Sequence, residues 1–331
     1  MILVLMFMGL RGTGDSLTPL WFMGLNVALD ASLNPVFILG LGPAPRMGIA
    51  GSATATLVAG VASVAALAAY IHWRGLPLRL RGAERRYVLP DRALTRTILA
   101  KGLPIGAQML VISVSALTMI GLVNRQGVAT TAAYGITQQL WAYVQMPAMA
   151  IGAAVSGMAA QNIGAGKWDR VARITRDGLV FNLLLTGGMV ALVLWFDRAI
   201  LGLFVGEGSP ALPIAQHISY LATWNFILFG ATMVLFGTVR ANGAVWGPLA
   251  ILFIGMFPVR LGFAYALLPT LGADALWWRF PIGSVSNLVL AALYYRYGPW
   301  RRGRLEVPHA TETDHRASAD MEPSGGFRPA T

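Results

Sequence analysis

The chain has 331 residues, of which 56% are hydrophobic and only 12% are charged. A soluble domain carries about 25% charged residues, so this composition excludes an ordinary soluble domain and indicates a membrane protein. The absence of cysteine excludes a disulfide framework, a thiolate metal site and a cysteine nucleophile.

Runs of about 20 apolar residues are long enough to cross a hydrocarbon core of about 30 Å as helices. A shorter apolar segment, residues 1–9, opens the chain, and we interpret it as the end of a helix whose beginning lies upstream. Strand barrels would instead show alternating segments of about ten residues. The expected fold class is therefore all-α, a polytopic helical bundle with eight complete spans at 17–40, 48–73, 98–123, 129–156, 178–205, 214–238, 248–270 and 274–297.

The basic residues of the connections alternate with these spans. The first connection, beginning at Arg11, and every second one after it together hold 18 Lys and Arg residues, whereas the connections between them hold three. Basic residues favour the cytoplasmic side, so we expect a multi-pass protein of the cell (inner) membrane with a cytoplasmic carboxy terminus. The net charge of +11 is explained by this topology, and no nucleic-acid partner is expected.

The chain contains an internal repeat. The block FMGLRGTGDSLTPLWFMGLNVALD, from Phe7, resembles LFGTVRANGAVWGPLAILFIGMFPV, from Leu235, with three matches at one offset: Arg11 to Arg240, Gly14 to Gly243 and Pro19 to Pro248. Both blocks lie on the same predicted side, which favours two lobes related by an axis along the membrane normal. A chance likeness between two Gly/Arg turns is the alternative.

Five stretches in order resemble the multidrug and toxic compound extrusion (MATE) family of secondary transporters: LRGTGDSLTP (10–19), LNPVFILGLGPAPRMGIAGSATAT (33–56), GLPIGAQM (102–109), AAYGITQQL (132–140) and SGMAAQNIGAGKWDRV (156–171). The resemblance covers nearly the whole chain, from the family's fourth helix to its twelfth. It implies two six-helix lobes, a central cavity, and export of bulky, often cationic organic compounds by a monomer. The coupling ion would be a proton or sodium, with no other cofactor.

On this reading the first lobe lacks almost four helices at the amino end, and the chain is an amino-terminally truncated transporter. The expected parts are the remainder of the amino-terminal lobe, a basic cytoplasmic linker, a six-helix carboxy-terminal lobe and a disordered cytoplasmic tail. Their residue ranges are 1–73, 74–97, 98–297 and 298–331.

Asp30 lies inside an apolar span, four residues after Asn26 and four before Asn34, so the three share one helix face. Charged groups within spans face the protein interior and mark ion or proton pathways. The alternative is a structural Asp that is hydrogen-bonded between helices. The resemblance implies a cation site here: alignment on Pro35 puts Asn34 at the family's Asp, Asp30 at its Asn and Thr56 at its Thr, so the first two appear exchanged.

One sodium-coupled branch of the MATE family has two acidic residues in its second lobe. This chain has Ile112 and Ala244 at those positions, so we expect ion coupling in the first lobe. A helical stripe with spacings of 4, 3 and 4 follows in the span at 129–156. Amides and aromatic rings suit a cavity wall for organic cations, although helix packing is the alternative. The predicted cavity residues are Tyr134, Gln138, Trp141, Gln145 and, from the preceding span, Gln108.

An ATP-driven pump and an enzyme are not supported. The GAGK sequence at 164–167 lacks the earlier Gly and the following Ser or Thr of a phosphate loop, and we interpret it as a helix–helix turn. With four histidines and no cysteine, no metal site is expected. Besides a drug/cation antiporter, three alternatives remain: a flippase for lipid-linked saccharides, which would favour cavity Arg and Lys, a channel or scaffold, and a non-functional remnant.

The charge pattern predicts the sidedness of the connections. In single-cysteine variants, Arg85→Cys and Lys167→Cys should react with an impermeant maleimide only from the cytoplasm, and Arg125→Cys only from outside. The cysteine-free parent is the blank. Labelling of position 85 from outside would reject both the orientation and the parallel repeat.

Overall fold

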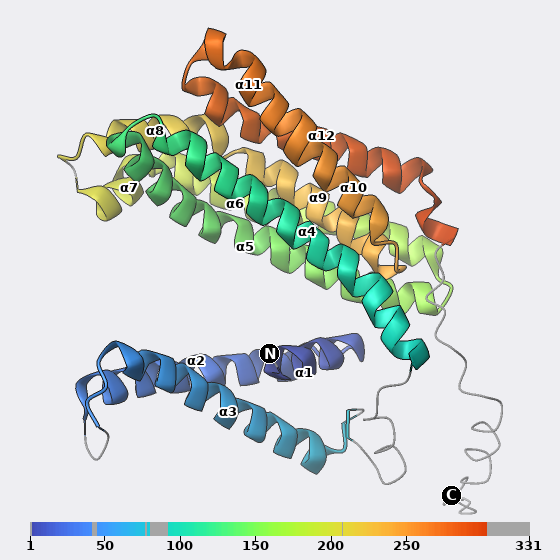
Figure 1. Cartoon of the computed structure of the whole chain (residues 1–331). Helices are drawn as coiled ribbons and strands as arrows, with labels where there is room; N and C mark the ends of the chain where they lie inside the picture. Colours follow the sequence, from blue (N-terminus) through green and yellow to red (C-terminus); the bar gives the residue numbers. More distant parts are fainter. Residues whose placement is uncertain (1, 42–44, 77, 80–91, 207, 303–331) are drawn as a thin grey trace, which may run out of the picture. The chain divides into compact units, whose positions relative to one another are not determined.

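The computed structural model describes residues 2–41, 45–76, 78–79, 92–206 and 208–302, and all regular secondary structure within them is helical (Figure 1). Residues 80–91 of the predicted linker and 303–331 of the predicted tail lie outside this described part. The chain forms two compact units. Unit 1 comprises residues 1–89 and 153–177, and unit 2 comprises residues 90–152 and 178–331.

Unit 1 contains α1 (Ile2–Gly12), α2 (Leu17–Leu39) and α3 (Ile49–Arg74). The helices α2 and α3 form an antiparallel hairpin, because Phe37 contacts Gly51 near the turn while the rings of Phe22 and Tyr70 lie 5.4 Å apart at the other end. A Cβ atom at Gly51 would overlap the Phe37 carbonyl. Small residues permit this close approach between membrane helices, and the buried stripe of α3 is Gly51, Ala55, Ala59, Ser63, Leu67 and Ile71.

The two predicted repeat turns share a backbone geometry. Gly14 and Gly243 both adopt left-handed conformations, with φ of 93° and 73°. Pro19 and Pro248 each occupy the third position of the following helix, where no intrahelical donor is lost. In the first turn the Asp15 carboxylate accepts hydrogen bonds from the Thr18 hydroxyl (2.6 Å) and from two backbone N–H groups, which hold the pKa of Asp15 below its usual value.

Unit 2 is a helical bundle whose main hydrophobic core includes Val144, Leu201 and Ile218. Two of its elements are irregular: α8 and α9 meet at an angle of 44°, and a π-helical turn, η2, interrupts the span after α10. The elements in chain order are α4 (Arg92–Asn124), α5 (Val128–Gly164), α6 (Trp168–Trp195), α7 (Asp197–Val205), α8 (Ala211–Ala222), α9 (Asn225–Ala241), α10 (Trp246–Ile254), η2 (Gly255–Val259), α11 (Arg260–Leu271), α12 (Asp274–Tyr297) and the 3₁₀ turn η3 (Pro299–Arg302). The amino end of α6 and the carboxy end of α5 belong to unit 1.

The prediction of eight complete spans is reproduced in part. Among the described residues, five helical segments are long and apolar enough to cross a membrane, or six if the bent α8–α9 pair is one span. The segment predicted at 178–205 is instead α6, which begins at Trp168, followed by the separate α7. Helices α5 and α12 cover the spans predicted at 129–156 and 274–297 but are not among the five, because amide groups in α5 and Arg279 in α12 lower their hydropathy.

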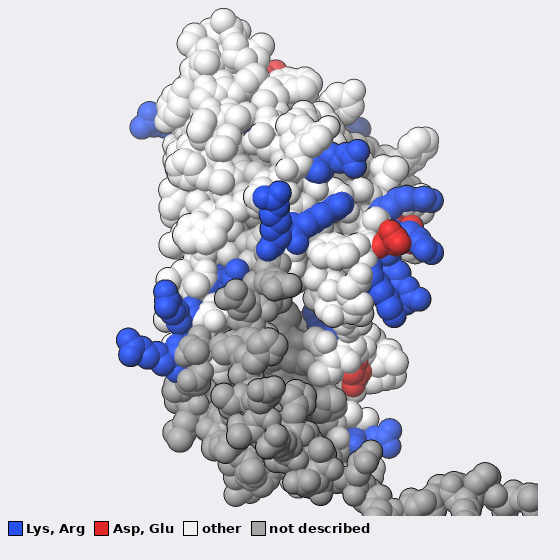
Figure 2. Space-filling view, turned by 90° about the vertical axis from the view of Figure 1, so that its right-hand side faces the viewer, with Lys and Arg blue, Asp and Glu red and all other residues white. Residues whose placement is uncertain are grey.

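Basic side chains gather at helix ends. Figure 2 shows many Lys and Arg side chains and few Asp or Glu side chains on the described surface of this face. Arg170 near the start of α6, Arg296 near the end of α12 and Arg301 in η3 are all exposed. The GAGK segment is a turn between α5 and α6, as predicted, with Gly166 at a φ of 69°.

The α2–α3 contact predicts a contrast between two glycines of α3. Gly51→Ala should destabilise the protein by about 1–3 kcal/mol, because the new methyl group meets backbone atoms that cannot rotate away. Gly60→Ala is the matched control, because no atom lies within 4 Å of its Cβ position, and it should be neutral or stabilising by up to about 1 kcal/mol. Thermal unfolding of both variants in detergent, followed by size-exclusion chromatography, tests the contrast; equal midpoints would contradict it.

Candidate functional site

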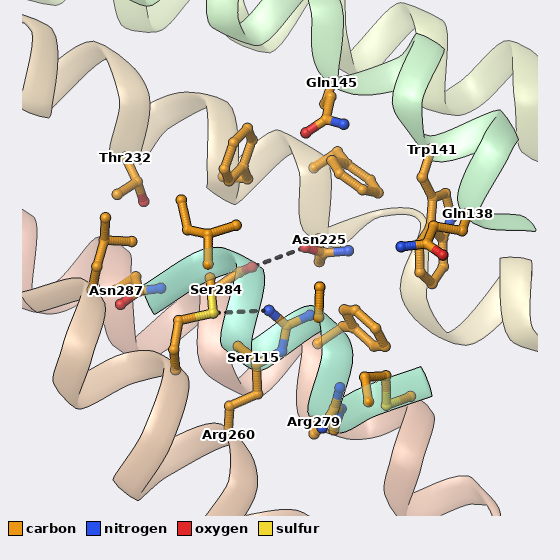
Figure 3. A pocket seen from close by; sticks show the side chains of 18 of the residues that line it. Ser115, Gln138, Trp141, Gln145, Asn225, Thr232, Arg260, Arg279, Ser284 and Asn287 are labelled. Carbon is orange, nitrogen blue, oxygen red and sulfur yellow. Dashed lines mark hydrogen bonds between the residues drawn. The ribbon is translucent and has the colours of Figure 1, made fainter. Parts of the chain in front are cut away.

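Unit 2 encloses a cavity of about 230 Å³ between α4, α5, α9, α11 and α12 (Figure 3). Its wall combines aromatic rings, amides, hydroxyls and two guanidinium groups. Such a mixture, mostly apolar with a few polar groups directed inward, is typical of a site for a small organic molecule.

The predicted stripe of α5 forms one wall of this cavity. Tyr134, Gln138, Trp141 and Gln145 all line it, as their helical spacing predicted. Tyr134 and Trp141 are buried, whereas both amides are half-buried. The structure therefore brings four of the five predicted cavity residues together on one face of a single helix.

The aromatic rings of the wall are held in place by their neighbours. Tyr134 stacks on Trp277, with centroids 5.8 Å apart, and Trp141 meets Phe280 edge-to-face at 5.0 Å. The indole Nε1 of Trp141 donates to the Thr223 hydroxyl at 2.8 Å. Because the indole donor is satisfied within the protein, the Trp141 ring offers a ligand its surface and not a hydrogen bond.

The break between α8 and α9 places Asn225. Its amide nitrogen donates to the Ala222 carbonyl at the break, and its oxygen accepts a hydrogen bond of 2.9 Å from Ser284 of α12. Asn287, one turn further along α12, lines the same cavity, and among the described residues its buried Oδ1 atom has no hydrogen-bond partner. The break thus directs Asn225 toward the polar groups that α12 contributes to the cavity (Figure 3).

The π-helical turn η2 places Arg260. A π turn shifts the helix face, and such turns are frequent at functional sites. The guanidinium carbon of Arg260 lies 4.0 Å from the centroid of Phe280, and Nη1 lies 3.2 Å from the Met256 sulfur. The side chain passes over Gly283, where a Cβ atom would come within 3.2 Å of Arg260 Cδ.

Arg279 is a second cavity cation, and the sequence reasoning missed it. It lies in the first half of α12, only 1% exposed, with its guanidinium carbon 5.1 Å from the Phe280 centroid. The available signal was an arginine inside a predicted span, the same feature that singled out Arg260. Neither Asp nor Glu is among the described residues that line the cavity, so the cavity is electropositive.

Gln108 lies away from the cavity and holds the second repeat turn. Its side chain, 1% exposed, donates to the Val245 carbonyl at 3.2 Å and accepts a hydrogen bond from Arg240. Lys101, two turns earlier in α4, donates to the Gly243 carbonyl at 2.8 Å. The contacts of Gln108 are therefore those of a residue that fixes α4 to the turn between α9 and α10.

In unit 1, Asn26, Asp30 and Asn34 lie half-buried along α2. The Asn34 amide donates to the backbone carbonyl of Asp30 at 2.9 Å, while the buried Oδ1 atoms of Asp30 and Asn26 have no hydrogen-bond partner in the part of the chain that the structure describes. Thr56 is exposed, and its hydroxyl donates to the backbone carbonyl of Ser52 within α3. Within the described residues, no hydrogen bond joins Thr56 to the α2 group.

The chain is similar to curated transport proteins. The MatE family model matches residues 104–266. The probable multidrug resistance protein YoeA of Bacillus subtilis is 35% identical over 301 residues, which are 89% of this chain and 64% of YoeA. The probable multidrug resistance protein NorM of Pseudomonas aeruginosa is 29% identical, covering 93% of this chain and 64% of NorM. An FAD transporter of Shewanella oneidensis is 27% identical over 75% of this chain and 53% of that protein.

Solved structures share the fold. A MATE protein in complex with MaL6 superposes with a TM-score of 0.77 at 20% identity, over 87% of this chain and 64% of that one. A MOP superfamily transporter from Pyrococcus furiosus gives a TM-score of 0.76 at 20% identity, over 87% and 62%. At these identities the likeness concerns the fold alone. This chain spans less than two thirds of the length of these relatives.

The hydrogen bonds of Gln108 predict that its substitution affects folding and not ligand binding. Gln108→Leu should lower the free energy of unfolding by about 1–3 kcal/mol, because a half-buried Arg240 donor loses its acceptor. Gln138→Leu, which replaces a half-buried residue of the cavity wall, is the matched comparison. It should leave the free energy of unfolding within about 0.5 kcal/mol of that of the parent. Thermal unfolding in detergent decides this, and a larger loss for Gln138→Leu than for Gln108→Leu would reverse the assignment.

Proposed function

The chain belongs to the MATE family of transporters, and on this premise we propose that it is part of a secondary active antiporter that exports small organic compounds in exchange for protons or sodium ions. The family consists of transporters and not enzymes, which agrees with the expectation from the sequence. The observation that carries the proposal is the cavity of unit 2, where the stripe from Tyr134 to Gln145 lies beside the rings of Phe226 and Phe280.

We propose that the protein has the eight-span topology and the part boundaries expected from the sequence, with a cytoplasmic carboxy terminus. The equivalent geometry of the turns at Gly14 and Gly243 supports a lobe repeat. The exposed Arg170, Arg296 and Arg301, which lie at or near helix ends, support the orientation, because Lys and Arg are retained on the cytoplasmic side.

We assign ion coupling to the face of α2 that carries Asp30. The contacts of Phe37 with Gly51 and of Phe22 with Tyr70 set the register of the hairpin, and this register brings Ser63 to the level of Asn26 and Asp30. Within the described residues, the buried Ser63 hydroxyl, like the Asn26 and Asp30 Oδ1 atoms, has no hydrogen-bond partner. Such oxygen atoms can coordinate a cation, and the Asp30 carboxylate can instead take up a proton, which is what coupling requires.

A flippase for lipid-linked saccharides is the second candidate. The observation that favours it is the presence of two arginines, Arg260 and Arg279, in the cavity wall, since guanidinium groups bind pyrophosphate well. The two candidates differ in the ligand that the cavity accepts, and a binding comparison between a soluble compound and a phospholipid separates them.

Coupling is tested by exchanging the acid and the amide of α2. Asp30→Asn should abolish proton- or sodium-driven export, at least about a hundredfold, because an amide cannot exchange a proton. Asn34→Asp should be milder, because a second carboxylate can bind a cation but repels the carboxylate of Asp30. The double variant, Asp30→Asn with Asn34→Asp, should recover much of the loss, since it restores the order implied by the family resemblance.

The measurement is the dissipation of an imposed ion gradient across proteoliposomes when a substrate is added. Ethidium and naphthalene-1-carboxylate are the two test substrates. Ser32→Ala is the control, because Ser32 is exposed on α2 and its hydroxyl bonds only to the Ala28 carbonyl. Full transport by Asp30→Asn would make Asp30 a structural residue. A double variant as inactive as Asp30→Asn alone would refute the exchange of roles.

A further inference from the structure

The two cavity arginines lack the partners that charged groups inside a membrane protein require. Within the described residues, Arg260 Nε has no hydrogen-bond partner, and neither Nε nor Nη1 of Arg279 has one. Among the described residues, the hydrogen-bond acceptor of the Arg260 guanidinium is the Met256 sulfur, a weak acceptor. Burying an unpaired cation is costly, so such groups persist where a ligand or another function requires them.

Both guanidinium groups border the same ring. Their central carbons lie 4.0 Å and 5.1 Å from the Phe280 centroid, so they are at most about 9 Å apart. Two cations at this separation in a half-buried cavity repel each other, and the described lining contains no carboxylate to offset the repulsion. A cationic ligand would increase that repulsion, whereas an anion would remove it.

The rest of the wall is suited to an aromatic body. Trp141, Phe226 and Phe280 form contiguous ring contacts, with centroid separations of 5.7 Å and 5.0 Å from Trp141. The cavity of about 230 Å³ is large enough for a compound of one or two rings. The half-buried amides of Gln138 and Gln145 can donate to acceptor atoms on such a compound (Figure 3).

We propose that the unit 2 cavity selects acidic aromatic compounds, whose carboxylate or phosphate group is bound by Arg260 and Arg279 while the ring packs against Trp141 and Phe280. This inference rests on the proposed transport function and names its substrate class. It replaces the sequence-based expectation that the cavity accepts organic cations. That expectation was based on the α5 stripe and did not include Arg279. Guanidinium groups suit this task because they bind carboxylate or phosphate oxygens through paired N–H donors.

Three isosteric probes test the charge requirement: naphthalene-1-carboxylate, naphthalene-1-carboxamide and 1-naphthylmethylammonium. Binding is measured by calorimetry, with the full chain in nanodiscs of zwitterionic phosphatidylcholine. The carboxylate should bind about tenfold to a hundredfold more tightly than the amide, the range expected for hydrogen bonds to a charged group. The ammonium compound should bind most weakly. An ammonium compound that binds as tightly as the carboxylate would overturn the proposal.

Substitutions then assign the effect to the two arginines. Arg260→Gln and Arg279→Gln should each weaken carboxylate binding about tenfold or more and leave amide binding within about twofold. Arg279→Lys should retain part of the preference, because it keeps the charge but not the fork of donors. Arg296→Gln is the matched control: Arg296 is exposed on the same helix, α12, and lies outside the cavity, so its loss should change none of the affinities.

Thermal stability separates a ligand-binding role from a structural one. Removal of an unpaired buried charge should leave the unfolding midpoint of Arg279→Gln equal to or above that of the parent. The carboxylate should raise the midpoint of the parent but not that of Arg279→Gln. A lowered midpoint of Arg279→Gln together with an unchanged carboxylate preference would make Arg279 a structural residue and reject the proposal.

The acidic group can belong to a soluble compound or to a lipid headgroup. Repeating the titration in nanodiscs that contain phosphatidic acid distinguishes these sources. If phosphatidic acid competes with the carboxylate in the parent but not in Arg279→Gln, the acidic-group site is supported and a lipid is identified as its ligand. If phosphatidic acid leaves carboxylate binding undiminished, a soluble acid is supported. Proteoliposomes test transport separately: carboxylate binding without ion-coupled movement of any probe would reject the antiporter and leave the binding site intact.

Discussion

The structure depends on one constraint: a polar group in a membrane-spanning bundle must find a partner within the protein or face a cavity. Asn182 shows the first solution, since its amide donates to the Ile227 carbonyl and its oxygen accepts from Thr186. Gly230 makes room for that amide, as a Cβ atom there would overlap it. Arg260, Arg279 and Asn287 show the second solution, because each has polar atoms without a partner among the described residues and all three line one cavity.

Two departures from regular helix build this cavity. The break between α8 and α9 frees backbone groups that Asn225 caps, and it directs Asn225 toward Ser284. The π turn η2, which contains Pro258, changes the face on which Arg260 emerges at the start of α11. The irregular backbone is therefore what converts buried polar residues into the lining of a site.

The acidic and basic groups within the apolar segments are divided between the two units. Unit 1 carries Asp30 on α2, and unit 2 carries Arg260 and Arg279 around its cavity. A carboxylate can bind a proton or a cation, whereas a guanidinium group binds anions. The division fits the proposed antiporter, in which ion and substrate would occupy different places and be linked through conformational change.

The sequence by itself determined the class of protein and most of its helices, because hydropathy depends on composition over about 20 residues. It also predicted the repeated Arg/Gly turns and the α5 stripe, since helical spacing alone places Tyr134, Gln138, Trp141 and Gln145 on one face. Only the tertiary structure decided the rest. Gln108 turned toward Arg240, which lies on a helix far away in the chain, and Arg260 and Arg279 of two different helices came to border the ring of Phe280. No local periodicity encodes either arrangement.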